Sequence, residues 1–324
     1  MIFACSSPEA PSFNSSQSNV KGITLVSWNR IEYQSAKARN QLNQIQSLGA
    51  NTLVVIVTAY QQDVTSNNII LDAKKTPDME AVKNCLEWAI SMGFKVIIKP
   101  HVNCYSGAWS GMIHPSNPIE WFTSYSNFIM PLAKLADSLD ASYFIIGTEL
   151  GNTIQYAAQW SNVIDQIRSV FSGPLTYAAS WDEFIFVPFW EKLDVIGINA
   201  YFPVSNRRDA SRVEFLSGWQ HWLNRLELLS LRTHKNILFT EIGYQSMDGA
   251  GMHPHVFDNY FPMDLQEQAD LYWAALTATQ NLPWLEGVVW WNWLASGKGG
   301  PANTDYTPMD KPAAEILYSF WVNQ

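Results

Sequence analysis

The sequence predicts a single (β/α)8 barrel, and two observations predict it. From Lys21 onward, eight short apolar runs alternate with longer amphipathic runs, and no low-complexity linker divides the chain. With 324 residues, 47% of them apolar, the chain is long enough to build one large core. The alternative is a doubly wound open sheet, which normally carries a Gly-rich phosphate turn after its first strand. The segment SWNRIEY that follows the first apolar run has no such turn.

Each predicted strand is a short apolar run, rich in β-branched or aromatic residues and bounded by polar or turn-forming residues. In chain order, the strands are predicted at 22–28, 51–60, 95–102, 143–150, 174–180, 194–201, 237–244 and 287–293. The amphipathic runs between them predict helices near 35–48, 78–92, 118–139, 157–171, 209–231, 265–280 and 312–321. The link after the fifth strand is short and irregular, so we expect no regular helix there.

Charge and aromatic content limit the class of ligand. The chain carries 29 Asp and Glu against 20 Lys and Arg, a net charge of -9, which opposes binding to nucleic acid or to acidic lipid faces. It also contains 15 Trp, 13 Tyr and 16 Phe. Flat apolar rings with polar edges are suited to stacking on sugar rings, and they also serve as packing in a large barrel. The composition therefore favours a neutral ligand.

The first residues, MIFACSSPEAPSFNSSQSN, predict a disordered tether over 1–20, with the barrel occupying 21–324. The stretch IFAC resembles the end of a bacterial lipobox, so Cys5 is a candidate lipid-anchor site; the alternative is a simple disordered tail. A lipidated Cys5 would make this a secreted, cell-surface or periplasmic bacterial lipoprotein. With Cys85 and Cys104, the chain has three cysteines, and they provide neither a disulfide framework nor paired zinc-ligand spacing.

In a (β/α)8 barrel the working residues follow the carboxyl ends of the strands, because the βα loops there build the pocket. These strand ends are rich in aromatic rings and amides and include two carboxylates, with almost no free cation. Such a set fits a neutral ligand rich in hydroxyl groups. The residues are Trp28, Tyr60, His101, Asn103, Glu149, Trp181, Asp182, Asn199, Tyr201, Glu241, Tyr244, Trp291, Asn292 and Trp293.

Glu149 and Glu241 each end a strongly apolar strand, IIGTE and ILFTE. Strand alternation would give each an inward direction, so that the two carboxyls face each other across the barrel mouth. Such a pair suits hydrolysis of a glycosidic bond, and a retaining mechanism requires the carboxyls about 5 to 5.5 Å apart. One must then be protonated and the other ionised near the working pH. The alternative is a structural ion pair or a solvated loop residue.

The chain resembles the family 113 β-mannanases, which belong to the clan of retaining barrel glycosidases. The resemblance covers residues 21 to 322 and is carried by IKPHVNCYSGAWSG, by IIGTELGN with INAYFPV, and by FTEIGYQS followed by VVWWNW. It implies that Glu149 is the acid/base and Glu241 the nucleophile. It also implies that Tyr201 hydrogen-bonds the nucleophile and that Trp291 or Trp293 forms a platform under the sugar. No cofactor is implied, because hydrolysis needs two carboxyls and water.

The chain departs from the pattern of the family at three positions. Thr148 stands where many clan members have an Asn that binds the sugar 2-hydroxyl, so Asn199 or Asn103 would have to supply that contact. Asn103 and Ser110 stand where an Asp and an Arg are expected from the family. The resemblance therefore predicts the type of reaction more firmly than it predicts the sugar.

Further candidates surround the two carboxyls, and each has a structural alternative. His101 would donate to a sugar hydroxyl or orient a carboxylate, or else be a satisfied structural histidine. Trp28, Trp109 and Trp181 would stack on sugars or pack the wall. His253 and His255 with Asp258 lack a third ligand of clear spacing, so we expect the segment 247–261 to be a loop at the rim of the site rather than a metal site.

The sequence thus predicts a retaining glycoside hydrolase that acts on a neutral β-linked polysaccharide or oligosaccharide, with β-1,4-mannan favoured by the resemblance. We expect a monomer that uses no metal and binds no nucleic acid. Two alternatives stay open. The barrel would cleave another β-glycan or act from chain ends, or it would be a catalytically silent glycan-binding surface protein.

Overall fold

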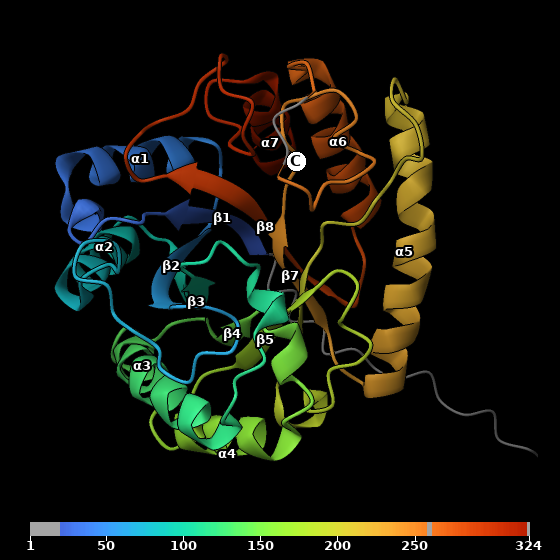
Figure 1. Cartoon of the computed structure of the whole chain (residues 1–324). Helices are drawn as coiled ribbons and strands as arrows, with labels where there is room; N and C mark the ends of the chain where they lie inside the picture. Colours follow the sequence, from blue (N-terminus) through green and yellow to red (C-terminus); the bar gives the residue numbers. More distant parts are fainter. Residues whose placement is uncertain (1–19, 258–260, 323–324) are drawn as a thin grey trace, which may run out of the picture.

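The computed structural model describes residues 20–257 and 261–322, and its eight parallel strands form a closed barrel in the order β1 to β8 (Figure 1). The predicted (β/α)8 fold is confirmed. Cys5 and nearly all of the predicted tether lie outside the described residues and stay predictions. The strands are β1 Val20–Val26, β2 Thr52–Gln61, β3 Lys95–Cys104, β4 Tyr143–Thr148, β5 Leu175–Ser180, β6 Ile196–Asn199, β7 Ile237–Ile242 and β8 Leu285–Leu294.

Seven α-helices surround the barrel in the described part of the chain, in the places that the amphipathic runs predict (Figure 1). Most begin where a Ser, Asp or Asn side chain accepts a backbone N–H of the first turn, as Ser211 does within a capping box with Glu214. After β5 the described chain has a short 3-10 turn, Trp190–Lys192, instead of a helix. The helices are α1 Ala36–Ser47, α2 Met79–Ser91, α3 Pro118–Ser138, α4 Ala157–Arg168, α5 Arg212–Thr233, α6 Leu265–Thr279 and α7 Pro312–Val322.

The apolar core has two layers, one inside the barrel and one between the strands and the helices. The inner layer is small, and most of its residues come from the first half of their strands: Val20, Val54, Ile97, Tyr143, Ile145, Ala178, Val195, Leu238 and Val289. The outer layer is much larger and includes the fully buried rings of Trp121, Trp160 and Trp219 on the helices. The second half of the barrel interior is therefore free for polar side chains.

Among the described residues, no helix has both the length and the apolar character needed to cross a membrane.

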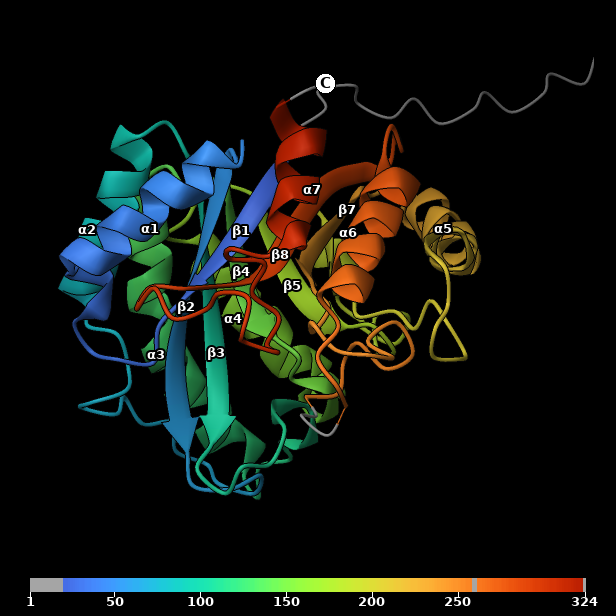
Figure 2. The ribbon, with the colours of Figure 1, turned by 90° about the horizontal axis from the view of Figure 1, so that it is seen from above.

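The carboxyl ends of the strands point to one side of the barrel, as the arrowheads of β2 and β3 show in Figure 2. The long pair β2 and β3 keeps one register over ten residues, from Thr52 opposite Lys95 to Gln61 opposite Cys104. This regular ladder carries His101 and Asn103 to the end of the barrel where the loops gather.

Elsewhere the register shifts by one residue just before each candidate carboxyl. In β4 the extra residue lies between Ile145 and Thr148, and in β7 it lies between Phe239 and Ile242. Phe239 packs in the outer layer, so strict alternation would turn Glu241 outward as well. The bulge turns it into the barrel. For Glu241 the expectation of an inward direction by simple alternation is therefore wrong in its reason, whereas Glu149 follows the alternation of the inward-facing Ile145; both side chains reach the barrel mouth.

Candidate active site

A cavity of about 570 Å³ opens at the carboxyl ends of the strands, and both Glu149 and Glu241 line it. Of the other residues expected to bind the substrate, seven line the same cavity: Trp28, His101, Asn103, Trp109, Trp181, Tyr201 and Trp291. The structure thus gathers residues that come from loops and strands spread over more than 250 positions of the sequence. Asn199 and Trp293 do not line the cavity.

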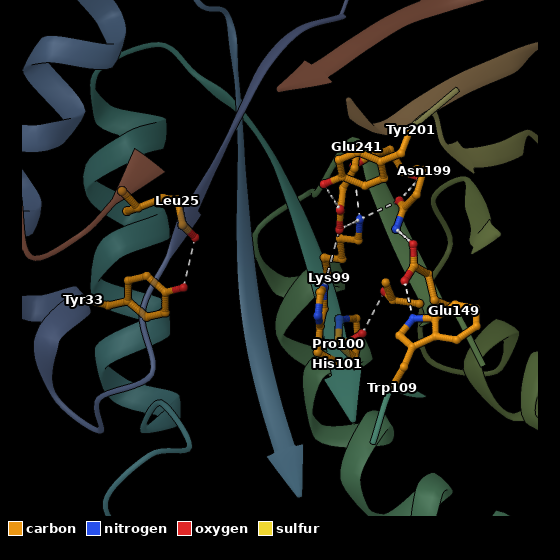
Figure 3. Close-up of polar contacts among 12 residues, drawn as sticks. Leu25, Tyr33, Lys99, Pro100, His101, Trp109, Glu149, Asn199, Tyr201 and Glu241 are labelled. Atoms are coloured by element: carbon orange, nitrogen blue, oxygen red, sulfur yellow. Dashed lines mark hydrogen bonds and ion pairs between the residues drawn. The ribbon is translucent and has the colours of Figure 1, made fainter. Parts of the chain in front are cut away.

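Glu241 extends from β7 into the floor of the cavity, and only 5% of the residue is exposed. Its Oε1 accepts a hydrogen bond of 2.6 Å from the Lys99 ammonium, and its Oε2 accepts one of 2.6 Å from the Tyr201 hydroxyl (Figure 3). Both bonds favour the ionised carboxylate and fix the plane of the group. The arrangement suits a carboxylate that must attack in one defined direction.

Lys99 is a site residue that the sequence reasoning missed. It lies on β3, is fully buried, and donates to Asn199 Oδ1 at 3.0 Å and to the Thr240 carbonyl at 3.1 Å, as well as to Glu241. Burial lowers the pKa of its ammonium, while the adjacent Glu241 carboxylate opposes that shift. The available signal was a lysine in the middle of the apolar strand KVIIKPHV, since lysine is almost never fully buried unless it is paired.

Glu149 follows β4 with a left-handed backbone, φ 48°, and its amide donates to the Ala178 carbonyl at 2.9 Å. Asn199 Nδ2 donates to its Oε1 and Trp109 Nε1 to its Oε2, both at 2.9 Å (Figure 3). Burial, and then the negative charge of Glu241, raise the pKa of the Glu149 carboxyl, although these two donors and Lys99 partly offset the rise. This carboxyl is therefore the one disposed to hold a proton.

A third carboxyl, the partly buried Glu183, which the sequence reasoning also missed, supports the turn after Glu149. The Tyr177 hydroxyl accepts the Leu150 amide at 2.7 Å and donates to Glu183 Oε1 at 3.1 Å. The Ser180 amide donates to the same oxygen at 3.0 Å. Burial raises the pKa of Glu183 to about 7, and the nearby Glu149 adds to the rise. The sequence DEF after the fifth strand gives no sign that this Glu faces inward.

Asn199 lies beneath the cavity, so the expectation that it contacts the sugar directly is corrected. The residue is fully buried, and both ends of its amide are occupied within the protein. Its oxygen accepts from Lys99 and from Thr240 Oγ1, at 3.0 and 2.9 Å, while its nitrogen donates to Glu149. Asn199 thus connects the surroundings of the two carboxyls. Asn103 does line the cavity and stays available to a ligand.

Trp293 is also corrected, because its ring packs outside the barrel. It is only 3% exposed, and its Nε1 donates to Gln41 of α1 at 2.8 Å. The register between β1 and β8 shifts where Ile23 pairs with Trp290 and Leu25 with Trp293, so the alternation of β8 is interrupted between these tryptophans. Trp291 alone of the two rings faces the cavity, and it lies against the His101 ring with centroids 6.0 Å apart.

His101 lies between Trp291 and the nucleophile candidate, with Nε2 3.9 Å from Glu241 Oε1. This buried nitrogen has no hydrogen-bond partner among the described residues. Burial, together with the neighbouring Lys99 ammonium, holds the pKa of His101 well below its usual range. The imidazole is therefore neutral, and His101 lines the cavity while its Nε2 lies buried beside the Glu241 carboxylate.

The loop after β7 contributes a wall of the cavity. His255 lies against the Trp181 ring with centroids 4.9 Å apart, and Phe257 lies against Tyr306 at 6.3 Å. All four residues line the cavity. Asp258, the third member of the candidate metal group, lies outside the described residues, and within the described ones no cluster of three or more His, Cys, Asp or Glu is arranged to hold a metal ion. A role for 247–261 at the rim of the site stays a prediction.

Comparisons with known proteins give one consistent family. Residues 25–311 match the model of Glycoside Hydrolase Family 113. A solved complex of a GH113 β-1,4-mannanase superimposes with a TM-score of 0.87 at 26% identity, covering 94% of this chain and 99% of that one. GH113 β-mannanase AaManA from Alicyclobacillus acidocaldarius gives 0.85 at 24% identity, covering 94% and 97%, a likeness of fold. No curated protein sequence matches the chain significantly.

The barrel also resembles part of larger enzymes. A β-glucuronidase from Ruminococcus gnavus superimposes with a TM-score of 0.64 at 14% identity, covering 94% of this chain and 50% of that one. At this identity the likeness shows the shared barrel fold alone.

Proposed function

Because the chain belongs to glycoside hydrolase family 113, we propose that it hydrolyses β-1,4-linked mannan or manno-oligosaccharides with retention of configuration. One observation carries the proposal. Glu149 and Glu241 line one cavity in opposite electrostatic surroundings, the first with a raised pKa and the second bound to an ammonium and a phenol. An acid and a nucleophile need this difference.

In the first step, a Glu241 carboxylate oxygen attacks the anomeric carbon. A glycosyl ester bond forms as the glycosidic C–O bond breaks, and the Glu149 proton passes to the leaving oxygen. Lys99 and Tyr201 hold the attacking carboxylate in place at 2.6 Å each, so the group does not have to reorient at the moment of attack.

In the second step, the Glu149 carboxylate removes a proton from water, which attacks the anomeric carbon. The ester bond breaks, and Glu241 leaves as a carboxylate. Esterification has removed the negative charge of Glu241, which was one of the causes that raised the pKa of Glu149. The change in charge therefore favours the ionised base that this step requires.

The substrate part of the proposal is supported by the aromatic lining of the cavity and by relatives described as β-1,4-mannanases at 26% identity. Asn103 and Ser110 line the cavity in place of the expected Asp and Arg, so the sugar contacts of this chain have their own pattern.

The lipid anchor at Cys5, the surface location and the monomeric state stay predictions. Mass spectrometry of the native protein tests the lipid anchor, and size-exclusion chromatography tests the monomeric state.

The test is product release from β-mannan, glucomannan, β-glucan and xylan by the wild type and by Glu241→Ala. Release from mannan by the wild type alone supports both the reaction and the nucleophile. Release from β-glucan or xylan, but not from mannan, would show that the substrate is another β-glycan. Binding without release from any of the four would favour a silent glycan-binding barrel.

A further inference from the structure

The Lys99 ammonium lies between the two carboxyls, and we propose that it is a positioning residue that compensates the charge of each of them in turn during the catalytic cycle (Figure 3). The inference rests on the proposed function, because it takes Glu241 as the nucleophile and Glu149 as the acid/base. It goes beyond that function because it assigns to one cation, Lys99, the compensation of negative charge in both steps of the reaction.

The contacts of Lys99 match an ammonium and not a neutral amine. Its Nζ has three oxygen acceptors, Glu241 Oε1 at 2.6 Å, Asn199 Oδ1 at 3.0 Å and the Thr240 carbonyl at 3.1 Å. An ammonium has three N–H donors, whereas a neutral amine has two and would direct its lone pair at an acceptor. The side chain is fully buried, so water does not compete for these positions.

The same ammonium orients the amide that binds the other carboxyl. Asn199 Oδ1 accepts from Lys99 and from Thr240 Oγ1, so turning the amide over would place its NH2 group against an ammonium. Its Nδ2 is therefore held toward Glu149 Oε1 at 2.9 Å. Lys99 acts on Glu149 through this hydrogen bond as well as through its charge.

Counting charges through the two steps shows why one cation suffices. Before the first step Glu241 is ionised and Glu149 protonated, so the two carboxyls and Lys99 together are neutral. After the ester forms, Glu241 carries no charge and Glu149, having given up its proton, is the anion. The three groups are neutral again. Without Lys99, the buried site would hold an uncompensated negative charge in both states, which is costly in a site of low polarity.

Other charged or titratable groups around the site do not provide this cation. On β3 itself His101 has a lowered pKa, and Tyr201 after β6, Tyr177 on β5 and Glu183 beyond it supply no positive charge. The remaining strands add no cation at the site. Lys21 of β1 donates to the Trp321 carbonyl, and Glu286 of β8 accepts from Asn236. Strand β2 has no Asp, Glu, Lys, Arg or His.

The test is a carboxyl titration that needs no substrate. Protein labelled with [δ-¹³C]glutamate is followed by ¹³C NMR, with the Glu149 signal assigned by its loss in Glu149→Gln. We expect Lys99→Met to move the Glu149 midpoint to higher pH by about one unit or more, because a nearby cation favours the carboxylate. The matched control is Lys311→Met, another lysine that is 3% exposed and donates to Ser246 Oγ and the Asp305 carbonyl.

A Glu149 midpoint that is unchanged in folded Lys99→Met, or that moves equally in Lys311→Met, overturns the proposal. If Lys99→Met does not fold, Lys99→Gln keeps two N–H donors without the charge and gives the same test. On the substrate that the wild type cleaves, kcat should fall about 100- to 1000-fold in Lys99→Met, with the basic limb of kcat/KM at higher pH. If the wild type cleaves none of the substrates but the Glu149 titration midpoint still moves in Lys99→Met, the result counts against the proposed function and not against the action of Lys99 on Glu149.

Discussion

The supports of the two carboxyls have opposite electrostatic character. Beside Glu241 lies a buried ammonium, Lys99, at 2.6 Å. Beside the turn that follows Glu149 lies a partly buried carboxyl, Glu183, whose pKa is raised to about 7. A cation stabilises the group that has to be ionised, whereas burial and the negative charge of Glu241 make the ionisation of Glu149 less favourable. Two glutamates with the same intrinsic chemistry are thereby prepared for different tasks.

The two carboxyls also differ in what holds them. Lys99 and Tyr201, the donors to Glu241, are both buried, one on β3 and the other directly after β6. One of the donors to Glu149 is Trp109, which lies in the loop after β3 and is 48% exposed. The nucleophile candidate is thus fixed by the barrel before a ligand arrives, whereas part of the surroundings of the acid candidate lies on a loop that a ligand would contact.

The largest expected effect comes from removing either carboxyl. Glu149→Ala and Glu241→Ala should each lower kcat by a factor on the order of 10⁴ or more, because each group forms or breaks a bond in the reaction. Azide with an aryl glycoside of good leaving ability then separates the roles. In Glu149→Ala azide should attack the glycosyl ester and give the β-glycosyl azide, and in Glu241→Ala it should take the place of the nucleophile and give the α-glycosyl azide. The reverse pairing of products would exchange the two roles.

Next in size is the loss of the phenol that holds Glu241. Tyr201→Phe removes the 2.6 Å bond to Oε2 and should lower kcat about 10- to 100-fold, since hydrogen bonds to charged groups contribute about 1.5–3 kcal/mol. The control is Tyr306→Phe, whose hydroxyl donates to the Pro254 carbonyl and not to a carboxylate. Equal losses in steady-state kcat for both variants would show that Tyr201 matters as wall packing alone.

A smaller effect is expected on the loop side. Trp109→Phe keeps a ring and removes the donor to Glu149 Oε2, so kcat/KM should fall about 10-fold. The lost bond favoured the carboxylate, so the pKa of Glu149 should rise and the basic limb of the pH profile should move to higher pH. Trp28→Phe, which changes a cavity ring without removing a bond to Glu149, should leave that limb in place. A basic limb that stays fixed in Trp109→Phe would contradict the assigned contact.

The smallest effect on activity is expected from Glu183→Gln, whose main effect is on stability. The pKa of this carboxyl is raised from 4.5 to about 7, so the native state binds its proton more tightly than the unfolded chain does. Its contribution to the free energy of unfolding is therefore present below pH 4.5 and lost as the pH rises through 7, by about 3 kcal/mol at most. Urea unfolding at pH 5 and pH 8 should show that loss in the wild type and not in Glu183→Gln. The same pH dependence in both proteins would mean that Glu183 ionises freely.

Most of the fold could be predicted because it depends on local patterns. Apolar runs such as NTLVVIVTAY and the amphipathic runs between them marked the strands and helices, and the absence of a helix after the fifth strand was visible in its short link. The positions of the two carboxyls followed from the rule that barrel sites lie at strand ends. Trp293 was misplaced because a one-residue shift of register in β8 cannot be recognised from an apolar pattern.

The sequence by itself determined the barrel and the pair of glutamates at its mouth, because hydrophobic periodicity and the ends of strands depend on residues that are neighbours in the chain. Only the tertiary structure decided how the surroundings of Glu241 and Glu149 differ. Lys99 meets Glu241 across 142 residues of chain, and Asn199 meets Glu149 across 50. Whether a lysine is paired, or a carboxyl keeps its proton, depends on burial and on charges brought together by the closed barrel, and no local pattern contains that information.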